Sequence, residues 1–151
     1  MMKKHLLTFA VIFISLFSTQ AQTRKENYEK IRAFKISFIA EKLNLTEQEA
    51  DKFWPLYTTY DRKMISLHKE ERYGIKHKIQ RLGGIDNLTE EESKDIIYKI
   101  KSVSKEQYET KNNFYSQLAT FLPYKKILML EVAEHEFRKK LIKKLRGKKK
   151  P

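Results

Sequence analysis

The apolar residues of this chain recur at the spacing of an α-helix over two unusually long stretches, and this pattern constrains the fold more than any other feature. The longer stretch spans residues 46–82 and the next residues 89–121, while shorter stretches cover residues 28–42 and 124–146. Glycine and proline, which weaken or break helices, number only four and three in 151 residues. The sequence therefore predicts an all-α fold of four helices, two long and two shorter.

Both long stretches open with the same signal for a helix start. A threonine can cap the free amides of the first turn, a glutamate three residues later completes a capping box, and a leucine precedes the threonine in the staple position. The residues of this helix-capping motif are Leu45, Thr46, Glu49, Leu88, Thr89 and Glu92. Helix stops are predicted at Asn44 and at Gly83-Gly84, because asparagine and glycine tolerate a left-handed backbone.

The two long helices should form an elongated hairpin. Helices of about 35 and 30 residues are each on the order of 50 Å long, and the short loop over residues 83–87 makes them antiparallel. Pro55 should kink the first long helix without ending it, because the apolar stripe continues in phase beyond it. Two helices cannot bury both apolar stripes, so either a homodimer covers them or an apolar face is left for client proteins. We expect a homodimer.

The N-terminal sequence predicts export. Two lysines precede an apolar run over residues 6–17, which is too short to span a bilayer, and small residues follow at Thr19 and Ala21. We therefore expect a periplasmic protein, without disulfides because the chain has no cysteine. The expected divisions are a cleaved signal peptide over residues 1–21, a single all-α domain over residues 22–146 and a basic disordered tail over residues 147–151.

The positive charge is concentrated at one end of the chain. Of the formal net charge of +13, eight positive charges lie in residues 139–151, which contain no acidic residue. An exported protein does not meet the chromosome, so we expect no nucleic-acid partner. The Lys-rich C-terminus either stays solvated or makes a peripheral contact with an anionic membrane surface.

Two segments resemble a known family. Residues 44–50 (NLTEQEA) resemble the Leu-Thr-x-x-Gln motif of the periplasmic Spy/CpxP/CnrX-like proteins, with Glu49 at the position of the glutamine, and residues 87–92 (NLTEEE) resemble a second copy. Residues 34–57 and 133–141 are also similar to short secreted Bacteroidetes proteins identified as sensors of ECF-type sigma factors.

The resemblance implies a helical envelope protein that works by binding. It implies a role in envelope stress sensing or regulation, with chaperone-like binding of unfolded protein, or alternatively a heavy-metal sensor. An exported sensor could reach a cytoplasmic sigma factor only through a membrane-bound signalling partner.

The sequence offers a candidate face for clients but no catalytic site. Cysteine nucleophiles, glycine-rich phosphate loops and nucleophile elbows are all missing from the sequence, so we expect a protein that is not an enzyme. Polar residues interrupt the apolar stripes at Glu71, Gln107, Lys111 and Glu134. They indicate either the floor of a client-binding surface or polar specifiers of register in a dimer seam. The expected client-binding face comprises Trp54, Tyr60, Met64, Glu71, Gln107, Lys111 and Phe114.

Metal binding is the alternative chemistry. Glu131 and His135 are four residues apart, a spacing that lets both side chains reach one ion from the same face of a helix. One carboxylate and one imidazole are too few for a tight zinc site, so a surface His–Glu pair is the simpler interpretation. We expect no cofactor beyond a weakly bound divalent metal.

Overall fold

A computed structural model describes residues 26–147, and within this range the chain consists of helices and turns with no strand. The prediction of an all-α chain with two long and two shorter helices is confirmed. The expected signal peptide and most of the expected basic tail lie outside the described residues. The helical elements are a helix over residues 26–43, α2 (Glu47–Lys69), the π-helical turn η1 (Glu70–Gly74), α3 (Ile75–Arg81), the short 3₁₀ turn η2 (Ile85–Asn87), α4 (Glu90–Leu118) and α5 (Tyr124–Gly147).

The described chain divides into two compact units. One comprises residues 45–128, and the other combines residues 26–44 with residues 129–147. No helix within residues 26–147 has both the length and the apolar character needed to cross a membrane.

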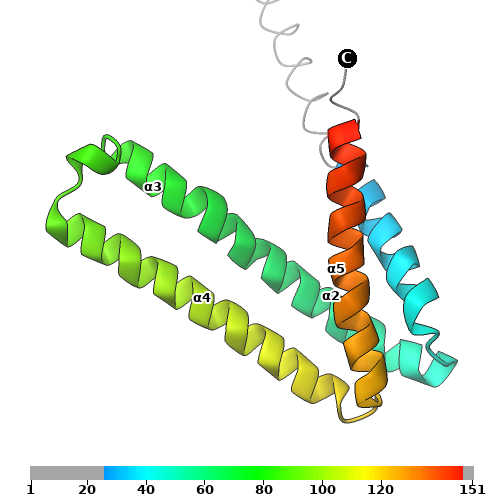
Figure 1. Cartoon of the computed structure of the whole chain (residues 1–151). Helices are drawn as coiled ribbons and strands as arrows, with labels where there is room; N and C mark the ends of the chain where they lie inside the picture. The colour runs from blue at the N-terminus through cyan, green and yellow to red at the C-terminus, as the bar shows by residue number, and fades with distance from the viewer. Residues whose placement is uncertain (1–25, 148–151) are drawn as a thin grey trace, which may run out of the picture. The chain divides into compact units, whose positions relative to one another are not determined.

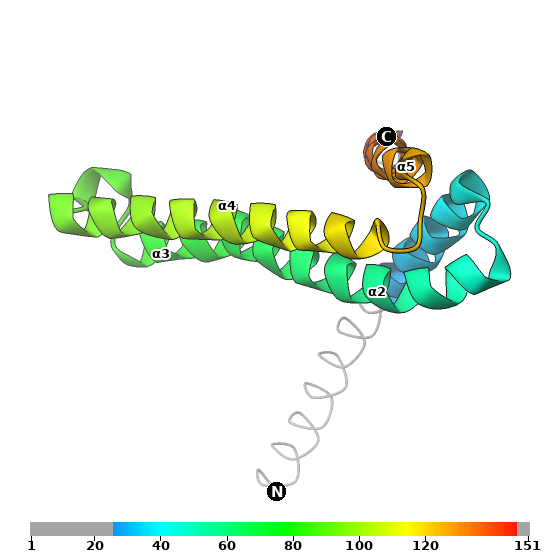
Figure 2. The ribbon, with the colours of Figure 1, turned by 90° about the horizontal axis from the view of Figure 1, so that it is seen from below.

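The unit over residues 45–128 is a long antiparallel hairpin. Its first arm is formed by α2, η1 and α3, and Figures 1 and 2 show α4 lying alongside this arm. The turn between the arms contains Gly83 and Gly84 at φ angles of 89° and 93°, a region that favours glycine. The predicted stop at Gly83-Gly84 is therefore confirmed, and so is the stop at Asn44, which adopts φ 43°.

Both predicted capping boxes form. The Glu49 amide donates to Thr46 Oγ1 at 3.3 Å, and the Thr46 amide donates to Glu49 Oε2 at 2.8 Å. The same pair of bonds joins Thr89 and Glu92, at 3.2 and 2.9 Å. These bonds satisfy amides that the first turn of a helix leaves without a partner, so they fix where α2 and α4 begin.

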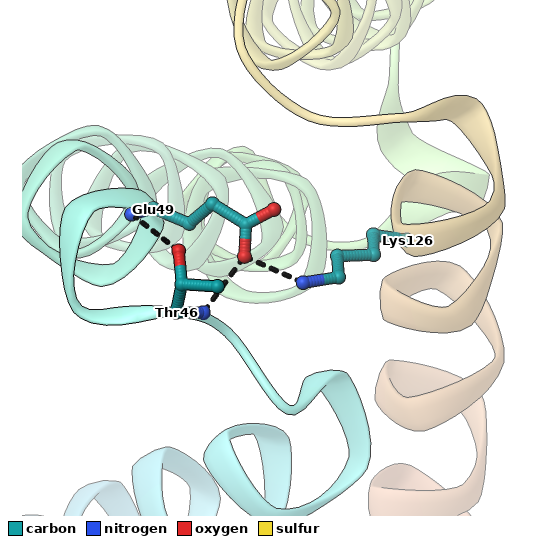
Figure 3. A network of polar contacts seen from close by, with 3 residues as sticks. All are labelled: Thr46, Glu49 and Lys126. Carbon is teal, nitrogen blue, oxygen red and sulfur yellow. Dashed lines mark hydrogen bonds and ion pairs between the residues drawn. The ribbon is translucent and has the colours of Figure 1, made fainter.

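The box at the start of α2 has an additional partner. Lys126 Nζ, in the first turns of α5, donates to Glu49 Oε2 at 2.5 Å, so one carboxylate oxygen serves both the cap and an ion pair (Figure 3). The bond from Lys126 and then the bond from the Thr46 amide hold the pKa of Glu49 below its ordinary value of 4.5. This carboxylate ties the beginning of α2 to the beginning of α5.

The first arm differs from the predicted uninterrupted α-helix at its centre. The helix continues through Pro55 as predicted, with Thr59 Oγ1 donating to the Pro55 carbonyl at 3.0 Å. Over residues 70–74, however, the chain forms a π-helical turn, whose backbone hydrogen bonds join residues five apart instead of four. The arm is therefore an α-helix, a π-turn and a second α-helix.

The predicted apolar stripes form the core of the hairpin. Buried residues of the first arm face buried residues of α4, namely Phe53, Tyr57, Leu67 and Ile75 on one side and Ile96, Val103, Phe114 and Leu118 on the other. Phe121, which was expected on the α4 stripe, instead follows the end of the helix and is half-buried in the turn. Leu122 is buried there.

The second unit pairs the helix over residues 26–43 with residues 129–147 of α5. Phe137 packs between Phe34 and Phe38, with ring centroids 5.4 and 6.1 Å apart. The partly buried Glu134 lies 3.3 Å from Lys35 Nζ, so this carboxylate on the core-facing side of α5 is paired within the chain.

Candidate functional site

Two hollows open between the arms of the hairpin. The tip hollow, near the Gly83-Gly84 turn, has a volume of about 620 Å³ and is lined by Glu70, Gly74, Ile75, His77, Lys78, Arg81, Asp95, Ile96, Tyr98, Lys99 and Ser102. The base hollow, nearer the start of α2, has a volume of about 300 Å³ and is lined by Leu56, Thr59, Tyr60, Lys63, Thr110, Asn113, Phe114 and Gln117.

Both hollows lie along the same face of α4. Asp95 of the tip hollow and Asn113 of the base hollow are 18 residues apart, which is five full turns of an α-helix. Glu106, which is at a similar angle on α4, forms an ion pair with Lys63 across the hairpin. The hairpin therefore presents one side on which two hollows follow each other, and we call this side the hollow face.

The tip hollow combines apolar walls with a charged rim. Ile75 and Ile96 are buried at the bottom of the tip hollow, whereas Tyr98 at its edge is 58% exposed. A Cβ atom at Gly74 would lie 2.4 Å from Glu70 Oε2, so the glycine gives the Glu70 side chain the space it occupies. Glu70 in turn lies 3.5 Å from Lys99 Nζ across the hairpin. Small and aliphatic residues leave this hollow open.

The base hollow is more completely filled by aromatic rings. Tyr60 stacks on Phe114 across the hairpin, with centroids 4.0 Å apart and planes inclined by only 7°. Tyr57 approaches Phe114 at 6.2 Å and stacks on Phe53 at 5.3 Å. This aromatic cluster joins the arms and leaves a smaller opening.

A polar cluster lies between the two hollows along the hairpin. Gln107 Nε2 donates to Glu71 Oε2 at 3.0 Å and lies 3.3 Å from His68 Nδ1, which is itself 3.6 Å from Glu71. The Gln107 bond is the main cause that lowers the pKa of Glu71. The cluster joins α4 to the π-turn at one level of the hairpin.

The structure brings together part of the expected client-binding face. Tyr60 and Phe114 both line the base hollow, although Phe114 is otherwise buried, and Glu71 and Gln107 bond to each other. Five of the seven expected residues line neither hollow, namely Glu71, Gln107, Trp54, Met64 and Lys111. Trp54 packs on Phe53 and Tyr57, Lys111 lies 5.4 Å above the Tyr115 ring, and Met64 is half-buried on α2.

The polar residues in the stripes pair within the chain. Glu71 bonds to Gln107 across the hairpin, and Glu134 meets Lys35 in the other unit, so each partner comes from the same chain. Sequence reasoning did not identify the tip hollow. An isolated glycine inside a helical pattern, at Gly74, was the available signal, because such a glycine often marks a close packing requirement.

The expected metal ligands are not joined by others. Glu131 is half-buried and His135 is exposed on α5. Within residues 26–147, no group of three or more His, Cys, Asp or Glu side chains is arranged to hold a metal ion.

The chain was compared with models of known protein families, with curated proteins and with solved structures, and none of the three comparisons found a match.

Proposed function

We propose that this protein binds unfolded or partly folded proteins on the hollow face of its hairpin, as a periplasmic binding protein in envelope stress sensing or regulation. The observation that carries the proposal is the arrangement of two hollows along one face of α4, each with apolar walls and a polar rim. The proposal involves no chemical step, and binding alone is the activity.

The dimensions of the face suit an extended chain better than a compact ligand. The 18 residues of α4 that connect the hollows span about 27 Å at 1.5 Å per residue. At about 3.3 Å per residue, roughly eight residues of an extended polypeptide would cover that distance. Such a segment could place one apolar side chain in each hollow.

The composition of the face favours weak binding of many sequences. Ile75, Ile96 and Tyr98 supply apolar surface, while Lys78 and Arg81 stand beside Glu70 and Asp95 at the rim. Adjacent charges of both signs prevent the face from selecting one kind of charged client. Apolar contacts without a demanding hydrogen-bond pattern are typical of promiscuous binding.

The sequence supports the setting of this activity. The signal peptide expected over residues 1–21 would deliver the protein to the periplasm, and the resemblance of residues 44–50 to Leu-Thr-x-x-Gln proteins is consistent with an envelope stress role. A membrane-bound signalling partner would then report client occupancy to the cytoplasm.

An aggregation assay with a matched pair of variants tests the proposal. Purified protein at stoichiometric amounts should suppress light scattering by a chemically unfolded model client. Tyr98→Ser should weaken suppression about threefold or more, because the exposed ring at the edge of the tip hollow is lost.

The control is Tyr108→Ser on the same helix. The Tyr108 side chain is 71% exposed and lines neither hollow, so this variant should suppress aggregation like the unmodified protein. A protein that does not suppress aggregation at equimolar client, or two tyrosine variants with equal effects, would refute binding on the hollow face.

A further inference from the structure

The outer side of α5 carries an exposed stripe of apolar and basic residues. Leu128, Val132 and Ile142 are 65, 50 and 50% exposed. We define the α5 stripe as Leu128, Val132, His135, Lys139, Ile142 and Arg146. Successive members are four, three, four, three and four residues apart, so all six lie on one side of this continuous helix.

This stripe is opposite the side of α5 that the fold buries. The buried residues of the helix include Leu130, Ala133 and Phe137, whose helical positions face away from the stripe. The apolar side chains of the stripe are therefore additional to those needed for the core. They give the solvent side of this helix apolar surface in addition to its charge.

The charge on and beside the C-terminal half of the stripe is positive. From Arg138 to Gly147 the helix has six basic residues and no acidic residue. Lys140 and Lys144 lie over the rings of Phe38 and Phe34, at 5.0 and 5.3 Å. Lys139 and Arg146 on the stripe, by contrast, form no ion pair with any residue in the described part of the chain. Their charges are available to an external partner.

We propose that the α5 stripe docks the folded protein on the surface of an anionic phospholipid bilayer. A helix that lies in the membrane interface needs apolar residues to enter the acyl boundary and basic residues to meet the headgroups, and the stripe supplies both on one side. A second copy of the chain fits this surface less well, because a two-fold contact would place the basic stripes of both copies against each other. This inference does not depend on client binding by the hairpin.

The proposal differs from a contact made by the basic tail alone. The tail over residues 147–151 carries lysines but no apolar residue apart from its final proline, so it could bind lipid only by charge. The α5 stripe would add apolar contacts, which high salt does not screen. The two sources of binding are therefore separable by experiment.

Cosedimentation with vesicles tests the charged half of the stripe. The chain from residue 22 should bind vesicles of equal parts phosphatidylglycerol and phosphatidylcholine and should bind pure phosphatidylcholine weakly. Lys139→Glu with Arg146→Glu should reduce binding to the anionic vesicles about tenfold or more. Lys76→Glu with Lys101→Glu makes the same change in net charge on exposed hairpin residues and should reduce binding about twofold at most.

A second pair of variants tests the apolar half. Leu128→Ser with Ile142→Ser should lower affinity for the anionic vesicles about tenfold, whereas the exposed pair Ile65→Ser with Ile97→Ser should leave affinity unchanged. Circular dichroism should show native helix content for all four variants, since every changed residue is exposed.

Three results would overturn the proposal. The first is equal vesicle binding by the Lys139/Arg146 variant and its control. The second is loss of binding on deletion of residues 148–151 while both stripe variants bind normally, which would assign the contact to the tail. The third is a change of oligomeric state, rather than of vesicle binding, in the Leu128/Ile142 variant, which would make a second copy the occupant.

Discussion

The base and the tip of the hairpin join the same two arms by different means. At the base, stacked rings fill the space between α2 and α4, with Tyr60 only 4.0 Å from Phe114, and a hollow of about 300 Å³ remains. At the tip, Gly74, Ile75 and Ile96 provide less side-chain volume, and the hollow is about 620 Å³. The smaller buried side chains thus accompany the larger of the two hollows.

The comparison indicates a division of roles along the hairpin. Aromatic rings bury more surface per residue than aliphatic side chains, so the base should contribute more to stability. The tip retains space at the cost of contacts, next to a π-turn of the kind that is frequent at functional sites. Stability would thus be concentrated at the base and binding capacity at the tip.

The largest expected effect comes from removing core side chains at the two ends. Phe114→Ala should lower the free energy of unfolding by about 3–5 kcal/mol, and Ile96→Ala by about 2–3 kcal/mol. Urea denaturation followed by circular dichroism measures both. Tyr108→Ala, at an exposed position of the same helix, should change stability by about 0.5 kcal/mol at most. If Ile96→Ala costs as much as Phe114→Ala, the base is not the stronger end.

Phe114→Leu provides the same comparison if the alanine variant does not fold. It keeps an apolar side chain against Tyr60 and should cost about 1 kcal/mol. A folded Phe114→Leu with an unfolded Phe114→Ala would show that apolar volume at position 114 holds the base together, whether or not it is a ring.

Removing either of the two capping boxes, one at each end of the hairpin, should lower the free energy of unfolding by less than the core substitutions do. Thr46→Ala and Thr89→Ala should each cost about 1 kcal/mol, because each removes one cap of the same geometry. Glu49→Gln should destabilise more than Glu92→Gln, since Glu49 also pairs with Lys126.

The effect at Glu49 should depend on pH. Its pKa in the folded protein lies below the ordinary value of 4.5, so its contribution is fully present above that value and is lost as the pH falls through the lowered pKa. Unfolding curves of the unmodified protein and Glu49→Gln should therefore converge in acid. Curves that stay equally far apart at every pH would contradict the ion pair.

The smallest expected effect concerns the polar cluster between the ends. Gln107→Ala should cost about 0.5 kcal/mol at neutral pH, because its partner Glu71 is half-exposed and screened. The pKa of Glu71, measured by NMR titration, should rise toward 4.5 in this variant. Gln80→Ala on the exposed side of α3 is the control and should leave that pKa unchanged.

The parts of the fold that depend on local signals were predictable from the sequence. Thr46 and Thr89 cap their own first turns, and Gly83-Gly84 ends its helix through its own backbone, so each signal lies within a few residues of its effect. The apolar stripes were equally readable, because a helical core needs residues at fixed spacing.

The π-turn was harder to predict because it alters the period of the pattern only slightly. Leu67, Glu71, Ile75 and Ile79 are each four residues apart. In an α-helix every such step rotates the stripe by about 40°, and a turn with i→i+5 bonds removes part of that rotation. A run of four-residue steps was therefore the available signal.

The hollow face depends on contacts between distant residues. The bond from Gln107 to Glu71 joins positions 36 apart, and no local pattern sets the level at which the two arms meet. Trp54 and Lys111 had suitable chemistry for a binding face, yet their contacts are with neighbouring rings rather than with the hollows. The residue types were predictable, but their grouping required the packing of the arms.

Site-specific photocrosslinking tests client binding on the hollow face most directly. A benzophenone amino acid would be placed at position 98, at the edge of the tip hollow, or at position 108, which lines neither hollow, and each protein would be irradiated with an unfolded client. The account predicts strong crosslinking from position 98 and little from position 108. Equal crosslinking from both positions, or none from position 98, would contradict it.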